Sequence, residues 1–398
     1  MEIKVYKFGG TSLEGKERLK NAVASCAADI RKGAKVLCVV SAMGKTTDKL
    51  FNFVQETNPL ATIDDSISII GLGEIISARL FDYLLKREGV KSTTMEPSSA
   101  EWPIFLKKDG TLDRRVCSRK VNKYLPGLLG KFDCVVVPGF VGLKKDGSWG
   151  SLGRGGSDLT AFILGKFLGA GEIIIVKDVD GIFNADPRVF TGAKKLKYIT
   201  ADELSSMSSF GAKVIHSDAL SFKAKNQKAK IVHFSFGNLA YEGTVVDGKV
   251  KRKLFILEEK LCLISIYKDE ITGERKLIKA VTNKVLDVTK IFGITLGIDY
   301  LGFYVPSSKS PEVLGKLGEI SKKKAFSLIQ RNDIALLIMK RESAVNLPGM
   351  INYLLTPLSK KGINIVETIT IGREILVFVK WEDRNRAMDA LKRRKVKK

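Results

Sequence analysis

The strongest fold signal in the chain is the sequence LGRGGSDLTA, which occupies residues 152–161. It predicts a glycine-rich turn that leads into an amphipathic helix ending at about residue 168. A valine-rich run at 133–140 precedes it and predicts a buried strand. Glycine allows a backbone to approach a ligand closely and to adopt conformations that other residues avoid. This combination of strand, turn and helix indicates an α/β fold with a ligand near the turn.

The chemistry of this turn points to an anionic ligand. Ser157 or Asp158 could cap the helix, and the free N–H groups at a helix start attract negative charge. Arg154 adds a planar guanidinium that suits a carboxylate or a phosphate. The alternative is a structural turn that carries a surface arginine, because short glycine motifs also occur without a ligand.

Length and composition limit the class of protein. A chain of 398 residues predicts two or three domains. No apolar run reaches the roughly 18–20 residues of a membrane span, and residues 1–4 lead directly into a strand pattern without a signal peptide. The five cysteines form no CxxC pair, and only two histidines accompany them. A zinc or disulfide framework is therefore not expected, and we expect a cytoplasmic protein that does not contact a membrane.

The net charge is +24, from 67 basic and 43 acidic residues, which raises the question of a nucleic-acid partner. The lysines are spread along the chain, and the densest basic run is 392–398. No helix-turn-helix, zinc-finger or RNA-binding signature accompanies them. A solvated basic surface is the favoured interpretation, so nucleic acid is not expected. A positive field would also attract anionic substrates such as a nucleotide and a dicarboxylic acid.

The N-terminal segment repeats the arrangement of strand, glycine turn and helix. Residues 3–8 form a short apolar strand that ends in KFGGTS at 7–12, and a helix is expected over 14–31. This is not a Walker A loop, because no Gly-Lys-Ser/Thr closes it. Lys7 could instead reach a transferring phosphoryl group from the strand end. The alternative is a lysine that only extends its ammonium group to solvent.

Two further motifs follow in the same half of the chain. The strand 35–41 ends in SAMGKTTD at 41–48, whose hydroxyls could bond a substrate carboxylate or cap the next helix. A long helix predicted over 66–86 contains GEIIS at 73–77. Its Glu74 lies among apolar residues and is either a surface carboxylate or a buried partner for a cation such as an ammonium group.

Strands alternate with helices as far as residue 236, and one of these strands is expected over 102–106. The apolar strand 173–176 runs into DVDGIFNADPR at 178–188, whose aspartates could serve a nucleotide or form Asx turns. A helix predicted over 211–221 overlaps FGAKVIH at 210–216. The alternation indicates a mainly parallel open sheet with helices on both faces. The glycine turns follow strand ends, where such sheets bind ligands.

The C-terminal part differs in composition. We expect a domain over 1–240, a polar linker over 237–253, and two smaller domains over 254–330 and 331–398. The first of the smaller domains is expected to contain a strand over 285–292. The second has a β-α-β-β pattern with LPGM at 347–350 in a strand-to-helix turn. A small effector could meet backbone N–H groups there, although packing and dimerisation are equally plausible roles for both units.

Taken in order, these motifs resemble those of the aspartate kinases of the amino-acid kinase family, followed by a pair of ACT domains. The resemblance implies an amino-acid kinase fold and two ferredoxin-like βαββαβ domains that can interleave. It also implies transfer of the γ-phosphoryl group of ATP, with Mg²⁺, to the β-carboxylate of L-aspartate. This is the first step of lysine, threonine and methionine biosynthesis. The alternatives are a related kinase with another acid as acceptor, or a non-catalytic ACT sensor of amino acids.

The resemblance also implies roles for particular residues. Lys7 and Lys213 would contact the transferring group, and Asp158 would hold these lysines in place. Backbone N–H groups that would bind phosphate belong to Gly9 and Gly10. Residues that would bind aspartate are Arg154 for its α-carboxylate, Glu74 for its ammonium group, and Ser41, Thr46 and Ser157 for its remaining oxygens. Residues that would line the nucleotide pocket are Asp178, Phe183, Asp186 and Arg188.

Some positions depart from the family pattern. Lys177 stands where threonine is common, and Ser217 follows His216 where proline is usual. The effector loop that we expect near 278–283 contains no glycine, so feedback by lysine or threonine is not expected from that loop. ACT domains commonly pair through sheet edges, which implies a homodimer or a higher homo-oligomer.

Overall fold

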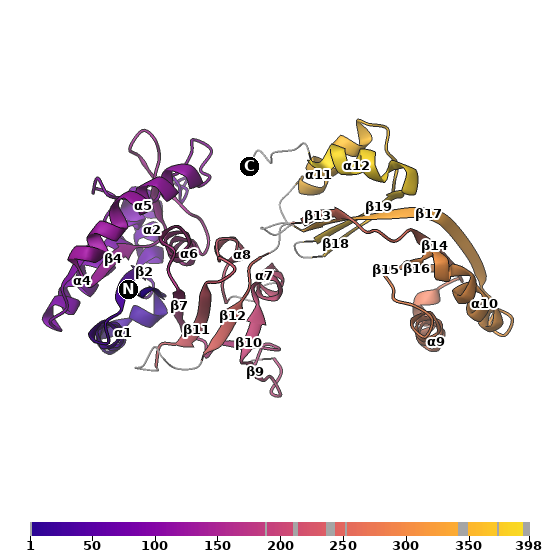
Figure 1. Ribbon diagram of the computed structural model, residues 1–398, viewed down its shortest axis with the longest axis horizontal. Helices are drawn as coiled ribbons and strands as arrows, with labels where there is room; N and C mark the ends of the chain where they lie inside the picture. Colours follow the sequence, from indigo (N-terminus) through magenta and orange to yellow (C-terminus); the bar gives the residue numbers. More distant parts are fainter. Residues whose placement is uncertain are drawn as a thin grey trace. The chain divides into compact units, whose positions relative to one another are not determined.

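A computed structural model describes residues 2–187, 189–209, 214–235, 243–250, 253–340, 349–371 and 374–392. The chain divides into two compact units, residues 1–251 and 252–397, each described by itself (Figure 1). Within the described residues, no helix is long and apolar enough to cross a membrane.

The first unit is built on an eight-stranded sheet with the order β10-β12-β11-β7-β1-β2-β4-β3. Its neighbouring strands are parallel except for the antiparallel pair β11 and β12. The predicted parallel open sheet is therefore confirmed. The strands are β1 (Ile3–Phe8), β2 (Lys35–Val40), β3 (Ser92–Thr94), β4 (Cys134–Pro138), β7 (Glu172–Lys177), β10 (Tyr198–Thr200), β11 (Lys228–His233) and β12 (Thr244–Asp247).

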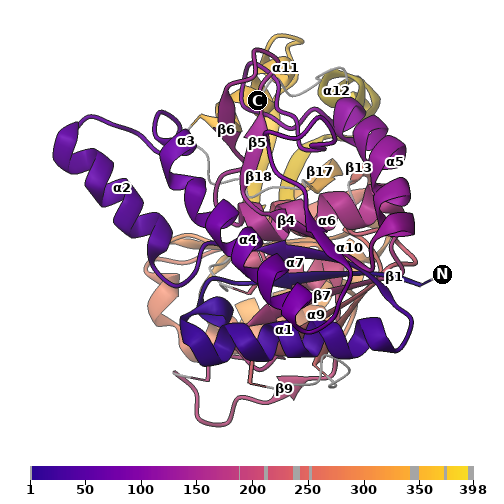
Figure 2. The same ribbon diagram turned by 90° about the vertical axis from the view of Figure 1, so that its left-hand side faces the viewer.

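Helices cover both faces of this sheet, as Figure 2 shows. Side chains alternate along each strand, so that Val5 of β1 enters one core and Tyr6 enters the other. One face carries α5 (Arg114–Lys131), α6 (Gly156–Leu168), α7 (Ala201–Ser209) and α8 (Ser217–Leu220). The other face carries α1 (Gly15–Arg31) and α4 (Leu72–Arg87).

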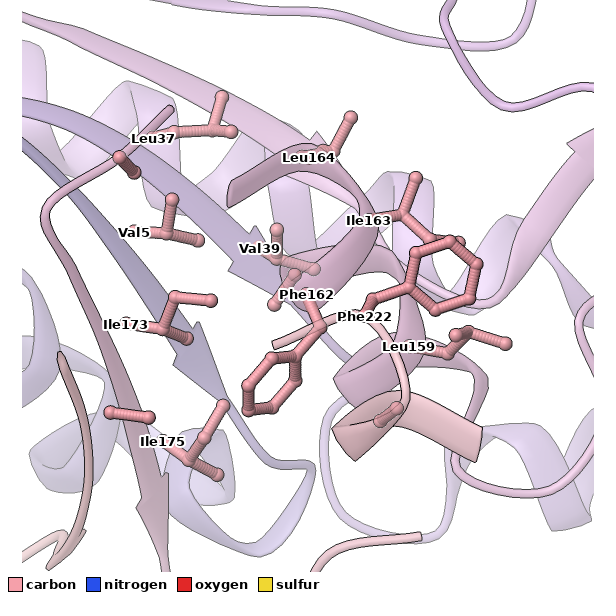
Figure 3. Packing of buried hydrophobic residues seen from close by; sticks show 14 of the residues in the cluster. Val5, Leu37, Val39, Leu159, Phe162, Ile163, Leu164, Ile173, Ile175 and Phe222 are labelled. Carbon is pink, nitrogen blue, oxygen red and sulfur yellow. The ribbon is translucent and has the colours of Figure 1, made fainter. Parts of the chain in front are cut away.

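Helix α6 is more deeply buried than its sequence predicts. Every residue from Gly156 to Gly165 is buried, because the helix packs on the sheet with one side and on α5 and α8 with others. Phe162 points towards Ile173 and Ile175 of β7 in Figure 3. The prediction of an amphipathic helix was wrong in this respect. Gly155 precedes the helix, and neither Ser157 nor Asp158 forms the predicted cap.

Three other local predictions differ from the structure. The helix predicted over 66–86 is divided at Gly71, where an added Cβ would lie 2.8 Å from Val141 Cγ2. The predicted linker contains β12, whose four residues are too few for a clear alternation in the sequence. The strand predicted over 102–106 is absent, since only isolated bridges form at Phe105 and Leu106. The remaining elements of this unit are α2 (Thr46–Thr57), α3 (Ile67–Ile70), β5 (Val141–Leu143), β6 (Trp149–Ser151), β8 (Ile182–Phe183) and β9 (Lys195–Leu196).

The second unit is a seven-stranded sheet with the path β15-β16-β14-β17-β19-β18, in which β13 pairs with β17. All of its pairings are antiparallel. The strands are β13 (Lys253–Ile256), β14 (Leu261–Tyr267), β15 (Gly293–Leu296), β16 (Tyr300–Pro306), β17 (Ser327–Lys340), β18 (Ile365–Ile371) and β19 (Glu374–Lys380). The helices are α9 (Arg275–Leu286), α10 (Ser310–Ser321), α11 (Met350–Ser359) and α12 (Arg384–Lys392).

The long strand β17 joins two βαββ-type halves. Its first half pairs with β14, which completes a βαββαβ arrangement of β14, α9, β15, β16, α10 and β17. Its second half pairs with β13 and β19. The strand β13 therefore precedes the first half in the chain but adds to the sheet of the second half. A boundary at residues 330 and 331 falls inside β17.

The position that we predicted for an effector loop was wrong. Residues 278–283 lie inside helix α9 rather than in a loop, and the end of α9 also replaces part of the strand predicted over 285–292. The turn between β14 and α9 lies earlier, over residues 268–274, and contains Gly273 together with Glu270 at a φ of 46°. The absence of glycine over 278–283 therefore says nothing about an effector. In the predicted 347–350 turn, the described residues begin at Gly349, which has a φ of 74°.

Candidate functional site

The site lies where β1, β2 and β7 end on the same edge of the sheet. The backbone N–H of Gly9 donates to Val176 O at 3.2 Å, and that of Ser41 donates to Phe8 O at 3.1 Å. The N–H of Gly44 donates to Gly10 O at 2.9 Å. These bonds join the glycine turn after β1 to the ends of its two neighbours. The structure thus brings together turns that are more than 130 residues apart in the sequence.

The glycines of the KFGGTS motif have different roles. A Cβ added to Gly10 would lie 2.6 Å from Ala42 O, so only glycine fits against the turn after β2. A Cβ added to Gly9 would lie 3.5 Å from Lys7 Nζ, which is ordinary contact. The N–H of Gly9 already bonds Val176 O. The predicted contact between this N–H and a phosphate therefore requires that bond to be given up.

The centre of the site is a buried carboxylate between two ammonium groups. Lys7 Nζ lies 2.7 Å from Asp158 Oδ1, and Lys177 Nζ lies 3.0 Å from Asp158 Oδ2. The exposed fractions of these side chains are 8% for Lys7, 16% for Lys177 and 4% for Asp158. Lys177 Nζ also donates to Val214 O. Asp158 was predicted to hold Lys7 and Lys213; it pairs with Lys7, Lys213 lies outside the described residues, and Lys177 is a partner that we did not predict.

The ionisation of this cluster follows from burial and charge together. Burial alone would raise the pKa of Asp158, but the charges and hydrogen bonds of Lys7 and Lys177 lower that pKa to about 2. Burial lowers the pKa of Lys7, and Asp158 opposes this effect while the charge of Lys177 adds to it. Two cations therefore share one anion, which leaves an excess of one positive charge beside the glycine turn.

Glu74 is the second buried acid, and its environment differs from that of Asp158. It lies in the first turn of α4 and is only 4% exposed. Burial raises the pKa of Glu74 to about 7, against hydrogen bonds from the backbone of Ala42 and Glu74 and the charge of Lys7. Its Oε2 atom is buried and has no hydrogen-bond partner. Burial excludes the interpretation of Glu74 as a surface carboxylate, and its role as the partner of a cation stays a prediction; a ligand ammonium group would supply the missing donor.

The turn that carries Arg154 is shaped by glycines. Gly153 and Gly155 have φ angles of 73° and 69°, and a Cβ on Gly155 would lie 2.6 Å from His216 Cβ. Arg154 is exposed, and within the described residues no carboxylate forms an ion pair with it. Ser157 is buried against Gly139.

The remaining predicted residues are less tightly placed. Thr46 Oγ1 donates to Met43 O at 2.6 Å, which uses its proton inside the turn. Asp178 and Asp186 are exposed, and Phe183 in β8 is half-buried. Asp180 binds Lys195 at 3.0 Å and fixes part of this loop. Lys213 and Arg188 lie outside the described residues.

The cluster offers no preformed metal cage. No group of three or more metal-ligating side chains occurs in the part of the chain that the structure describes. Both oxygens of Asp158 face lysines. Mg²⁺ commonly binds through substrate phosphates, waters and one or two carboxylates. The site therefore fits a magnesium ion that arrives with a nucleotide. Asp178 is exposed and lies close enough to Lys7 to raise its pKa, so its carboxylate could bind such an ion.

Comparison with known proteins agrees with this geometry. The model of the amino acid kinase family matches residues 2–233. The chain belongs to the amino acid kinase family. Aspartokinase 2 of Bacillus subtilis (strain 168) is 27% identical over 401 residues, which cover 98% of this chain and 97% of the relative. The aspartokinase of Bacillus sp. (strain MGA3) is 32% identical over 297 residues, which cover 73% and 68%. The predicted resemblance to aspartate kinases is thereby confirmed.

Solved structures show the same fold. Aspartate kinase from Synechocystis has a TM-score of 0.81 and 23% identity, and the match covers 98% of this chain and 68% of that chain. E. coli aspartokinase III in complex with aspartate and ADP has a TM-score of 0.55 and 20% identity, over 98% of this chain and 99% of that chain. The predicted fold class is confirmed for both the parallel and the antiparallel sheet.

Lys177 is the site residue that the sequence analysis did not assign. In the sequence, Lys177 was distinguished only by its departure from a family pattern. One signal was available, because a lysine at the end of a buried strand next to β1 must emerge beside Lys7 in a parallel sheet. To use that signal, one would have to know that β7 lies next to β1, and the order of the strands could not be predicted from the sequence.

The raised pKa of Glu74 predicts a specific dependence of stability on pH. Its pKa is about 7 in the folded chain and 4.5 in the reference state. The protonated acid therefore stabilises the fold fully below pH 4.5, and this contribution is lost as the pH rises to about 7. Relative to Glu74→Gln, the wild type should lose up to about 3 kcal/mol across this range. Urea unfolding without substrate measures the difference, with Glu56→Gln in exposed helix α2 as the control.

A difference between wild type and Glu74→Gln that stays constant across this pH range would contradict the assignment. The control variant should follow the wild type throughout, because Glu56 is exposed.

Proposed function

We propose that this chain is an aspartate kinase, which transfers the γ-phosphoryl group of ATP to the β-carboxylate of L-aspartate. The observation that carries the proposal is the ion-pair cluster of buried Lys7 and Asp158 with half-buried Lys177, beside a glycine turn. Full-length similarity to an aspartokinase of Bacillus subtilis supports the choice of acceptor. The product, 4-phospho-L-aspartate, begins the synthesis of lysine, threonine and methionine.

The chemistry requires charge and position more than proton transfer. A carboxylate acceptor is already ionised near neutral pH, so no general base is needed. Phosphoryl transfer depends on holding donor and acceptor in line and on stabilising the charge of the phosphoryl oxygens. Lys7 supplies an ammonium group at low exposure, where an electrostatic contact is stronger than in water. Lys213 is proposed as a second phosphate-binding lysine, and the N–H of Gly10 is proposed as a backbone donor.

The acceptor pocket uses two oppositely charged groups. Glu74 binds the ammonium group of aspartate through its unpartnered Oε2, and Arg154 binds the α-carboxylate. Ser41 and Ser157 contact the remaining oxygens, and Thr46 joins them if its hydroxyl group gives up the bond to Met43 O. A bound ammonium group favours the ionised form of Glu74, which would lower its pKa below the value of about 7 in the free site. This arrangement selects an α-amino acid over an N-acylated one.

The nucleotide and its magnesium ion would lie over the ends of β7 and β8. Asp178, Phe183, Asp186 and Arg188 contact the nucleotide, and Gly9 contributes if its bond to Val176 O opens. A magnesium ion bound with ATP would supply positive charge to the transferring group, with Asp178 as the carboxylate of this chain that would help to hold it. Cytoplasmic location stays a prediction from the sequence.

The second unit would contain two ACT domains and form a homodimer. The first comprises β14 to the first half of β17, and the second comprises the second half of β17 to α12, with β13 as its added strand. In the edge strand β15, the side chains of Ile294 and Leu296 are exposed on the face of the sheet that is covered by α9. Leu286, at the end of α9, is also exposed. A second copy that pairs along β15 would cover these side chains.

The first test is an assay with hydroxylamine, which traps acyl phosphates. Wild-type protein with ATP, Mg²⁺ and L-aspartate should form aspartyl hydroxamate, whereas glutamate and N-acetylglutamate should give little product. Lys7→Met should reduce kcat by about 10²- to 10³-fold, because an electrostatic contact to the transferring group is lost. Lys35→Met is a matched control, since Lys35 also binds an aspartate and is 20% exposed, but lies at the opposite end of the strands. Absence of hydroxamate and of ADP above background would refute the proposal.

The second test concerns the homodimer. Ile294→Asp and Leu296→Asp should each shift the protein from dimer to monomer, since a charge would be buried without a partner at the paired edge. Light scattering coupled to gel filtration measures the mass. Ile371→Asp, at a similarly exposed position in the other edge strand β18, should remain dimeric. A monomeric wild type, or a dimer that resists both substitutions at β15, would disprove pairing through this edge.

A further inference from the structure

Lys177 is a half-buried cation whose role the proposed mechanism does not yet include. It is the last residue of β7, and its ammonium group lies 3.0 Å from Asp158 Oδ2 while it also donates to Val214 O. The other carboxylate oxygen, Oδ1, lies 2.7 Å from Lys7 Nζ. Each oxygen of Asp158 therefore has its own lysine, and the lysines come from adjacent parallel strands.

This double pairing solves a problem that a single ion pair would create. If Lys7 were the only partner of Asp158, any movement of its ammonium group towards a phosphate would leave a buried carboxylate unpaired. Removing one member of a buried ion pair is strongly unfavourable. Lys7 would then be held by the protein and would be unable to follow the phosphoryl group. With Lys177 on the second oxygen, Asp158 keeps a partner whichever way Lys7 turns.

We propose that Lys177 is a positioning residue that keeps Asp158 paired while Lys7 leaves the carboxylate and binds the γ-phosphate of ATP. The inference rests on the proposed phosphoryl transfer. It assigns to Lys177 an action through Asp158 and Lys7, and no contact with either substrate. The bond from Lys177 to Val214 O also fixes the start of the segment that follows residue 213.

The charged groups around Lys177 define what its removal would change. On its own face it meets Asp158 from α6 and Lys7 from β1, while His233 is its register partner on β11. Asp178 adds negative charge near Lys7. Lys177 is one cause of the lowered pKa of Lys7, since like charges disfavour each other. A neutral residue at 177 should therefore raise the pKa of Lys7.

The experiment compares Lys177→Met, Lys177→Gln and Lys177→Arg with the control Lys35→Met. Lys177→Met removes the charge and the hydrogen bonds, Lys177→Gln keeps a donor without the charge, and Lys177→Arg keeps both. Thermal unfolding identifies any variant that is not folded. If Lys177→Met is unfolded, Lys177→Gln provides the same comparison.

In the aspartate assay, the neutral variants should lower kcat by about 10- to 100-fold with the KM for aspartate changed less than about threefold. The alkaline limb of the kcat profile should move to higher pH in these variants, because Lys7 loses a like-charged neighbour. Lys177→Arg and Lys35→Met should retain the wild-type profile. A purely structural role would lower stability without moving this limb, and that result would overturn the proposal.

A binding measurement tests the same inference without an acceptor. Calorimetry with ADP and with the analogue AMP-PNP measures how much the γ-phosphate adds to affinity. In the neutral variants, the ratio of the affinity for AMP-PNP to the affinity for ADP should fall, while the affinity for ADP is retained. The reason is that Lys7 remains in its ion pair with Asp158 and does not bind the γ-phosphate. Equal loss of both affinities would mean that Lys177 binds the nucleotide itself, and an unchanged preference would mean that it does not control Lys7. Either result overturns the proposal, even if aspartate is not the acceptor.

Discussion

The ionised carboxylate of Asp158, buried between two lysines, is the interaction on which the site depends. Helix α6 is buried on several sides by the sheet, α5 and α8, so its first turn carries the charge into the interior of the unit. A buried charge of this kind is stable only with partners. Lys7 and Lys177 can supply them because β1 and β7 are adjacent and parallel and end at the same edge. The strand order therefore determines the electrostatics of the site.

The two buried acids illustrate how one pocket can support two functions. Asp158 has a cation on each oxygen and a pKa of about 2, so it stays ionised and holds lysines. Glu74 accepts only backbone hydrogen bonds, and the charge of Lys7 acts on it from farther away. Its pKa of about 7 results from burial without a cation paired to the carboxylate. The first acid belongs to the phosphate side, and the second suits a substrate ammonium group. Burial is common to both, and the difference lies in their partners.

Much of this arrangement could be predicted from the sequence. The central strands β2, β4 and β7 contain uninterrupted apolar runs, β1 is a short apolar strand interrupted by Lys4 and Lys7, and turn motifs follow each of them directly, so the strands and the turns at their ends could be placed from the sequence. The burial of α6 and the division of the helix at Gly71 depend on contacts with distant segments, which local pattern cannot reveal. The short strand β12 has too few residues to show an alternation of apolar and polar side chains. Lys177 became a site residue only when β7 was known to lie beside β1.

The most direct test of the account is a crystal structure of the protein with ADP, L-aspartate and aluminium fluoride in place of the transferring phosphoryl group. The account predicts that Lys7 Nζ lies within about 3 Å of a fluoride, with the ammonium group of aspartate on Glu74. A structure in which the fluoride complex is bound elsewhere, with Lys7 still on Asp158 and remote from both ligands, would contradict it.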